Sequence, residues 1–272
     1  MITSRQNQHV RLFRALAQRR FRQREGKFTL DGVLQVAEAA DCGFRLERVL
    51  FCRRLLVSET GRSLLDRLPA DVPRLEVSEH VFRALTDRAE PQGIAAIAAL
   101  PRRSLADVQL SDRPLVAALE DIRDPGNLGA IVRTAHATKA DAVVTLGHSV
   151  DAFGPKAVRA AMGSLFHVPV IASDLSEFRR WARASRLRIV AAATDAARPY
   201  DRAPMPDRVA LLLGNEARGL SEEALATADE SVTIPMPGGT DSLNAAVAAG
   251  VLMYEVLRRR AATRDKGSDG EE

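Results

Sequence analysis

The 272-residue chain has few cysteines and lacks several common catalytic motifs. Its only two cysteines, Cys42 and Cys52, match neither a disulfide framework nor a zinc motif, so we expect buried thiols in a reducing cytosol. No G-x-G-x-x-G follows the first strand of the C-terminal half, and G-x-x-x-x-G-K-[ST], H-E-x-x-H and G-x-S-x-G do not occur. These absences argue against common nucleotide sites, metal-dependent chemistry and serine nucleophiles, and we expect no metal ion in the active site.

Long hydrophobic runs are also missing. No stretch approaches the roughly 20 apolar residues that a membrane span needs, and the start, "MITSRQNQHVRLF", has no apolar segment of the signal-peptide kind. Hydrophobic residues make up 46% of the chain and charged residues 27%, as in ordinary globular proteins. We therefore expect a cytoplasmic protein without membrane association, large enough for one large domain or two modest ones.

Acidic residues are scarce in the first 30 positions, where Glu25 stands alone against eight basic residues, a balance of 8 − 1 = +7. Phe13, Phe21 and Phe28 lie between the basic residues. A stripe of this density could contact phosphates, or it could be a solvated basic helix. Charge alone leaves both interpretations open.

The first half of the chain alternates strand and helix patterns over about 75 residues. This pattern predicts a small mixed α/β domain. The expected strands are 27–32, 45–52, 73–78 and 93–100, and the expected helices are 33–43, 58–68 and 79–87, with Ser58 as a helix cap. The polar stretch 101–113 begins with a proline and interrupts the pattern, so it is expected to be a linker.

The second half contains apolar runs that do not alternate, which is typical of a parallel sheet covered on both faces. The expected strands are 114–120, 141–147, 168–173, 188–194, 208–214 and 231–236, and the expected helices are 128–140, 155–166, 176–186, 221–228 and 242–261. The predicted organisation is a basic arm 1–26, an α/β domain 27–100, a linker 101–113, a parallel-sheet domain 114–262 and a disordered tail 263–272.

Three predicted strand ends of the second half are rich in glycine and asparagine. They read "EDIRDPGNLG", "LLLGNEARGLSEE" and "IPMPGGTDSLNAA", and each leads into a helix. Ligands of open parallel sheets bind beyond the carboxyl ends of strands, where glycine permits close backbone approach and helix N-termini present free N–H groups. We therefore expect one site built from all three ends.

Each polar residue at these ends also has an ordinary structural explanation. Asn127 could cap a helix, Arg133 could form a surface ion pair, and Glu216 could be a solvated loop acid. Ser242 could cap the last helix, with Asn244 in its first turn. One face of that helix is expected to be core; it carries Leu243, Val247, Gly250, Tyr254 and Leu257.

The three strand ends, together with "PKAVRAAMGSLFHVPV", resemble the signature motifs of the SpoU/TrmH family of RNA ribose 2′-O-methyltransferases, in the SPOUT superfamily. The resemblance covers residues 114–260, and the N-terminal block with "GKFTLDG" is similar to the family's RNA substrate-binding domain. It implies a trefoil knot, S-adenosyl-L-methionine as cofactor, a homodimer, and methylation of a ribose 2′-hydroxyl. The additional N-terminal domain favours 23S rRNA over tRNA as the substrate.

The resemblance also implies roles for individual residues. The cofactor would contact Gly214, Ile234 and Leu243, with Thr194 and Met236 nearby. The catalytic set would be Asn127, Arg133, Glu216, Ser242 and Asn244. The predicted RNA-binding residues are the arginines of the basic arm: Arg5, Arg11, Arg14, Arg19, Arg20, Arg22 and Arg24.

Two departures from the family pattern leave the catalytic set intact. Ala245 and Ala246 stand where many members have Val-Ser, and Asp31-Gly32 replaces Glu-Gly. A catalytically inactive RNA-binding protein would be expected to lack the polar motif residues, which are present here. A small-molecule enzyme with a nucleotide cofactor would leave the basic arm unexplained.

The role of Arg133 stays open at the level of sequence. Family proposals make this arginine a general base, although a guanidinium is normally always protonated. Stabilising a developing alkoxide or holding the 3′ phosphate is electrostatically easier. Glu216 could orient Arg133 or accept a proton through water.

Overall fold

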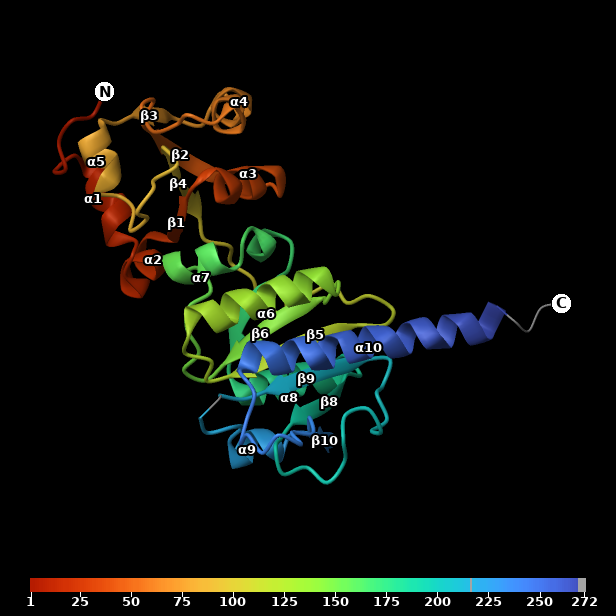
Figure 1. The fold of residues 1–272 in the computed structure, drawn as a ribbon. Helices are drawn as coiled ribbons and strands as arrows, with labels where there is room; N and C mark the ends of the chain where they lie inside the picture. Colours follow the sequence, from red (N-terminus) through yellow and green to blue (C-terminus); the bar gives the residue numbers. More distant parts are fainter. Residues whose placement is uncertain (216, 269–272) are drawn as a thin grey trace. The chain divides into compact units, whose positions relative to one another are not determined.

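The structure, a computed structural model, describes residues 1–215 and 217–268, with side chains described as far as residue 262. The chain forms two compact units (Figure 1). The first contains Met1–Arg102 and Asp151–His167, and the second contains Arg103–Val150 and Val168–Glu272. Residues 151–167, expected within the domain 114–262, therefore cluster with the N-terminal residues. The other domain boundaries remain predictions.

The first unit is built on a four-stranded sheet in the order β1-β4-β2-β3. Strands β1 and β2 run antiparallel to β4, and β3 runs parallel to β2. The strands are β1 (Lys27–Asp31), β2 (Leu46–Phe51), β3 (Arg74–Glu76) and β4 (Ile94–Ala99), and the helices are α1 (Gln8–Ala15), α2 (Arg19–Glu25), α3 (Val33–Asp41), α4 (Glu59–Arg67) and α5 (Glu79–Arg83). The mixed α/β prediction for this part is confirmed, including the cap at Ser58, which accepts from the Gly61 N–H.

Helix α1 is amphipathic, and this explains why arginine and apolar residues alternate in its sequence. Val10, Phe13 and Leu16 are buried in a core shared with Val81 and Phe82 of α5. The arginines between them therefore face solvent. Six of the seven predicted RNA-binding arginines are exposed: Arg5, Arg11, Arg14, Arg19, Arg20 and Arg24.

Arg22 is the exception, and its predicted contact with RNA does not fit the geometry. Its side chain is only 4% exposed. Nε and a terminal nitrogen donate to the Asp151 carboxylate at 2.9 and 2.6 Å, and the other terminal nitrogen donates to the carbonyls of Leu16 and Ala17 at 2.8 Å each. Its polar groups are satisfied within the protein, so Arg22 anchors the segment that begins at Asp151. The sequence pattern cannot distinguish this buried arginine from its exposed neighbours.

The anchored segment 151–167 packs on the first unit through aromatic side chains. Phe153 lies 5.0 Å from Phe28, and Phe166 lies 5.0 Å from Phe44, measured between ring centroids. The segment forms α7 (Pro155–Ala160) and a 3-10 turn, η2 (Ser164–Phe166), rather than the single helix expected over 155–166. The helix is interrupted because Met162 and Gly163 adopt φ values of 50° and 87°, both in the left-handed region.

The second unit contains a six-stranded, all-parallel sheet in the order β10-β8-β9-β5-β6-β7. Its strands are β5 (Leu115–Glu120), β6 (Ala142–Leu146), β7 (Val170–Ser173), β8 (Arg188–Ala192), β9 (Val209–Leu213) and β10 (Glu230–Val232), and its helices are η1 (Leu105–Asp107), α6 (Pro125–Ala137), α8 (Leu175–Ala184), α9 (Glu222–Leu225) and α10 (Ala245–Ser268). The predicted parallel sheet is confirmed. The trefoil knot remains a prediction.

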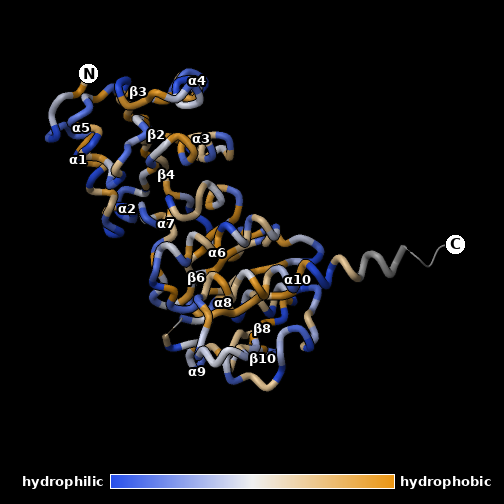
Figure 2. Tube along the Cα trace, viewed as in Figure 1, coloured by the Kyte–Doolittle hydropathy of each residue, from blue (hydrophilic) through white to orange (hydrophobic). Residues whose placement is uncertain are grey.

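Burial explains the unbroken apolar character of the strands. Every residue of β6 and β9 is buried, and hydrophobic stretches follow the strands while hydrophilic ones mark the loops (Figure 2). Strand β10 is shorter than expected because Pro235 and Pro237 have no N–H groups to continue a ladder. No helix in the described part of the chain is both long enough and apolar enough to cross a membrane.

Helix α10 packs beside α6 and on β9. The face expected to be core is wrong at two positions, because Val247 is 51% exposed and Tyr254 is 55% exposed. The buried face lies to one side of it and consists of Ala245, Ala249, Leu252, Met253 and Val256. The backbone is helical as far as Ser268, within the tail 263–272 that was expected to be disordered, because no proline interrupts that sequence; residues 269–272 lie outside the described residues.

Candidate active site

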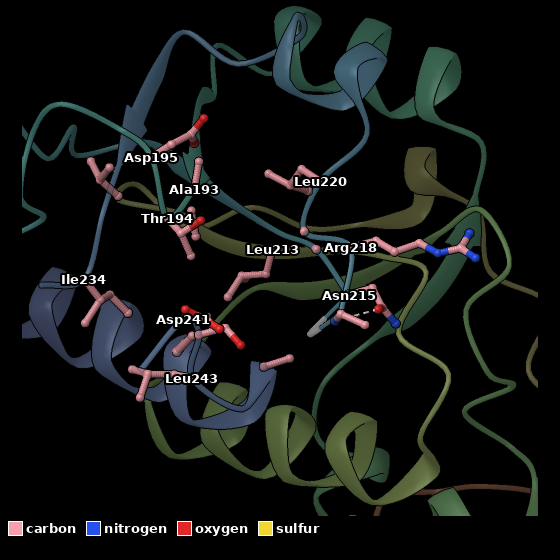
Figure 3. A pocket seen from close by; sticks show the side chains of 18 of the residues that line it. Ala193, Thr194, Asp195, Leu213, Asn215, Arg218, Leu220, Ile234, Asp241 and Leu243 are labelled. Carbon is pink, nitrogen blue, oxygen red and sulfur yellow. Dashed lines mark hydrogen bonds between the residues drawn. The ribbon is translucent and has the colours of Figure 1, made fainter. Parts of the chain in front are cut away.

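A cavity of about 490 Å³ lies in the second unit, beyond the carboxyl ends of β8, β9 and β10 (Figure 3). Parallel strands end at the same edge of the sheet, so three loops distant in sequence meet there. All five predicted cofactor residues line this cavity: Thr194, Gly214, Ile234, Met236 and Leu243. Ser242, from the predicted catalytic set, lines it as well.

Gly214 is required by the close approach of two backbone segments at the cavity. A Cβ atom at this position would collide with the backbone of Gly219 and Leu220. The loop closes on itself because the N–H groups of Asn215 and Gly219 each donate to the other's carbonyl, at 3.1 and 2.8 Å. The glycine predicted from sequence therefore allows the loop after β9 to fold tightly beside the cavity.

Asn215, which the sequence reasoning missed, joins two of the three loops. Its Nδ2 donates to the Asp121 carbonyl after β5 at 3.1 Å, and its Oδ1 accepts from the Ala217 N–H at 2.9 Å. A second link runs from Ser221, which donates to the Glu120 carboxylate through its N–H and its hydroxyl at 2.8 and 2.7 Å. The sequence feature that could have indicated this role is an asparagine directly after the glycine at the end of a strand. Glu216, between these residues, lies outside the described residues.

Asn127 and Asn244 join a second pair of the three loops, those after β5 and β10. The Nδ2 of Asn244 donates to Oδ1 of Asn127 at 2.9 Å. Asn127 is not the helix cap that was considered, because Asp124 caps α6 by accepting from the Asn127 N–H. Asn244, rather than Ser242, caps α10, since its Oδ1 accepts from the N–H groups two and three residues later at 2.9 and 3.3 Å. The Asn244 amide thus fixes the start of α10, and its hydrogen bond to Asn127 fixes the distance between two loops.

Arg133 lies apart from the cavity lining, on the exposed side of α6. Among the described residues, its guanidinium makes no hydrogen bond or ion pair. The surface ion pair considered as an alternative role is therefore not formed with any of them. The role of Arg133 at the ribose stays a prediction.

Helix α10 also holds the loop that follows β8. Arg259 donates to the carbonyls of Tyr200, Asp201 and Ala203 at 2.7 to 3.1 Å. Glu255, which is buried, accepts from both Arg258 and Arg259. The hydrogen bond from Arg258, ahead of the other contacts, holds the pKa of Glu255 below its ordinary value. Charge-assisted hydrogen bonds therefore hold the loop between β8 and β9 against α10.

The lining combines apolar and polar groups. Leu213, Ile234 and Leu243 provide apolar surface, while Asp195 and Asp241 place carboxylates at the rim (Figure 3). The volume lies within the roughly 300–1,000 Å³ that small-molecule sites occupy. No cluster of metal ligands lies among the described cavity residues. The arrangement suits an amphipathic ligand with an apolar portion, hydrogen-bonding groups and positive charge.

Comparison with known proteins agrees with this architecture. The model of the SpoU rRNA Methylase family matches residues 114–254, and that of the MRM3-like substrate binding domain matches residues 7–96. The chain is 32% identical to the 23S rRNA (guanosine(2553)-2'-O)-methyltransferase RlmP of Bacillus subtilis, over 94% of this chain and 98% of the relative. It is 30% identical to the 23S rRNA (uridine(2479)-2'-O)-methyltransferase of Streptomyces viridochromogenes, over 97% of this chain and 93% of the relative.

A solved structure agrees over nearly the whole chain. The SpoU methyltransferase AviRb from Streptomyces viridochromogenes, in complex with the cofactor AdoMet, matches with a TM-score of 0.88 and 28% identity. The match covers 94% of this chain and 99% of that one. The three motif loops, the parallel sheet and the family model coincide in the same residues, and the chain belongs to the SpoU rRNA methylase family.

Proposed function

We propose that this chain, an S-adenosylmethionine-dependent RNA ribose 2′-O-methyltransferase, acts on 23S rRNA and holds its cofactor in the cavity beyond β8, β9 and β10. The observation that carries the proposal is the convergence of all five expected cofactor residues on one cavity of suitable volume. These residues come from three separate loops, so their meeting was not guaranteed by proximity in sequence.

The cavity fits the cofactor in chemistry as well as size. The apolar walls accept an adenine ring, and backbone groups around Gly214 and Ile234 can hydrogen-bond its edge. Asp195 and Asp241 are exposed acids of the lining and suit the positive charges of the cofactor. When bound, S-adenosylmethionine supplies a methyl group activated by a sulfonium.

The residues of the chain would then orient the ribose and manage its proton. Asn127 and Asn244 keep two motif loops at a fixed separation, and Ser242 lies in the lining where it can hydrogen-bond a ligand. Arg133 would face the ribose or its phosphate and stabilise charge that develops on the 2′-oxygen. Glu216 keeps its expected role as a group that orients Arg133 or accepts a proton through water.

Both named relatives support 23S rRNA as the substrate, since each acts on a 23S rRNA ribose according to its name. The additional N-terminal domain and its exposed arginines favour a large structured RNA over tRNA. A cytoplasmic location forms part of the same proposal.

The proposal predicts that the purified chain transfers a labelled methyl group from S-adenosylmethionine to 23S rRNA without an added metal ion. Mapping of ribose methylation should find a single modified 2′-hydroxyl in rRNA from cells that carry the gene, and none at that nucleotide in cells without it. Transfer to tRNA alone would overturn the choice of substrate. Activity that a chelator abolishes, with RNA folding unaffected, would contradict the metal-free mechanism.

The expected homodimer has a suitable surface on α10. Val247 and Tyr254 are more than half exposed and are seven residues apart, so they share one helix face. Gly250 lies between them with open space above its Cα, which permits close approach of another helix. A second copy of this chain would cover this stripe.

We expect Tyr254→Glu to convert a dimer into a monomer, because a charge at the centre of an apolar interface is costly to bury. Sedimentation velocity measures the change. Val57→Glu, at an exposed apolar residue of the first unit, is the matched control and should leave the dimer intact. A wild-type chain that sediments as a monomer at micromolar concentration would overturn the dimer.

A further inference from the structure

The first unit brings together three metal-ligating side chains that the sequence keeps far apart. Glu38 and Cys42 are four residues apart at the end of α3 and therefore share a face, and His167 directly follows η2. Their carboxylate oxygen, thiol sulfur and imidazole nitrogen all lie within 4.8 Å of one another. Within the described part of the chain, no other group of three such residues does so.

The distances between these atoms suit a small cation. Cys42 Sγ is 3.6 Å from His167 Nε2 and 3.7 Å from Nδ1, and a tetrahedral zinc ion separates its sulfur and nitrogen ligands by about 3.6 Å. Glu38 Oε2 is 2.7 Å from His167 Nε2, in a hydrogen bond. A metal bound by all three would require the carboxylate to withdraw by about 0.6–0.7 Å and the imidazole to turn one nitrogen toward the ion.

The residues beside the ligands hold them in place. Phe44, two residues after Cys42, packs edge to face on Phe166, the residue before His167, at 5.0 Å. Gly163 makes room for Glu38, since a Cβ at that position would lie 2.7 Å from the glutamate Cγ. The cluster thus rests on packed aromatic rings and a close backbone approach, which favours a fixed ligand geometry.

We propose that Glu38, Cys42 and His167 form a binding site for one divalent metal ion, with Zn²⁺ the ion that best matches a mixed thiolate, imidazole and carboxylate set. Three protein ligands leave the fourth position to water. On binding, the Cys42 S–H bond breaks, its proton passes to solvent, and the thiolate electron pair forms the bond to the metal. No oxidation or reduction takes place.

The site is distinct from the cavity of the second unit, and the proposal does not depend on methyl transfer. Its effect would be to link α3 to the segment 151–167, which already contacts the first unit through Arg22 and the phenylalanine rings. A metal that binds only the folded state stabilises that state. The metal would thus act as a clamp on this segment.

Cobalt(II) provides the test, because thiolate ligation gives it a charge-transfer absorption. Titration of the full chain, free of any affinity tag, should produce this band and saturate at one Co²⁺ per chain, and added Zn²⁺ should abolish it by displacement. Cys42→Ser should remove the band. Cys52→Ala is the matched control, since Cys52 is the other thiol and is buried away from the cluster, and it should retain the band.

His167→Gln should weaken Zn²⁺ affinity by more than the roughly 10–100-fold that loss of an outer-shell partner costs. Zn²⁺ should raise the melting temperature of the wild type and leave that of Cys42→Ser unchanged. If Cys42→Ser fails to fold, Glu38→Gln and His167→Gln decide the question by the same titration. The proposal is overturned if the wild-type chain gives no thiolate band, or if the band survives in these variants. The cluster would then be a Glu38–His167 hydrogen bond beside an ordinary cysteine.

Discussion

Arg133→Ala is expected to reduce the rate of methyl transfer by about 10²–10³-fold, the usual cost of losing a preorganised donor to developing negative charge. Cofactor affinity should stay close to that of the wild type, because the cavity beyond β8, β9 and β10 does not include this residue. The melting temperature should also hardly change, since Arg133 is exposed and makes no ion pair with another described residue. Single-turnover kinetics, calorimetric titration with S-adenosylmethionine and thermal melts measure the three quantities.

Arg133→Lys separates two roles for the charge. A lysine retains the positive charge and can attract a phosphate, but it cannot reproduce the planar fork of a guanidinium. Methylation by the lysine variant at near the wild-type rate would point to simple phosphate attraction. Near-normal methylation by Arg133→Ala would remove the residue from the mechanism, and α6 would then contribute only Asn127 to the site.

The residues that line the cavity could be predicted because short motifs encode them locally, and their contact with the cofactor stays a prediction. Gly214 must be glycine where two backbone segments nearly touch, and Leu243 directly precedes the residue that caps α10. Such local constraints can be recognised in a few consecutive residues of the sequence. The links between loops do not, because the amide of Asn215 finds the Asp121 carbonyl only after the parallel sheet has brought two distant strand ends together.

The burial of a side chain is also difficult to predict from the local sequence. The period of apolar residues predicted the strands and most of the helices, yet α1 and α2 were not predicted, the core face of α10 was misplaced and Arg22 was grouped with exposed arginines. The last two errors have one origin, since a side chain becomes buried through the element packed against it. The partner of Arg22 is Asp151, which lies 129 residues later in the sequence. The residues around Arg22 give no indication of this ion pair.

Variants of the basic arm can test whether its exposed arginines bind RNA and whether its buried arginine stabilises the fold. Replacing Arg19, Arg20 and Arg24 of α2 with glutamine should weaken RNA binding by roughly 50–150-fold at 0.15 M salt, if each arginine contacts one phosphate. The dependence of log K on log salt should flatten by about 2 to 3, because fewer counterions are released. Filter binding to a 23S rRNA fragment at several salt concentrations measures both. Cofactor affinity should be unaffected.

Two sets of variants complete this test. The control variant removes the same number of exposed charges from the second unit by replacing Arg180, Arg183 and Arg188 with glutamine. An equal loss of RNA affinity in this control would mean that the arginines of the arm attract RNA only non-specifically. Arg22→Gln should instead lower the free energy of unfolding by roughly 2–4 kcal/mol, because it leaves the Asp151 carboxylate and two carbonyls without their donor. A stable Arg22→Gln protein that binds RNA weakly would mean that Arg22 leaves its buried position to contact the substrate. A destabilised one whose folded fraction retains the wild-type salt dependence would place Arg22 in the framework that presents the other arginines to RNA.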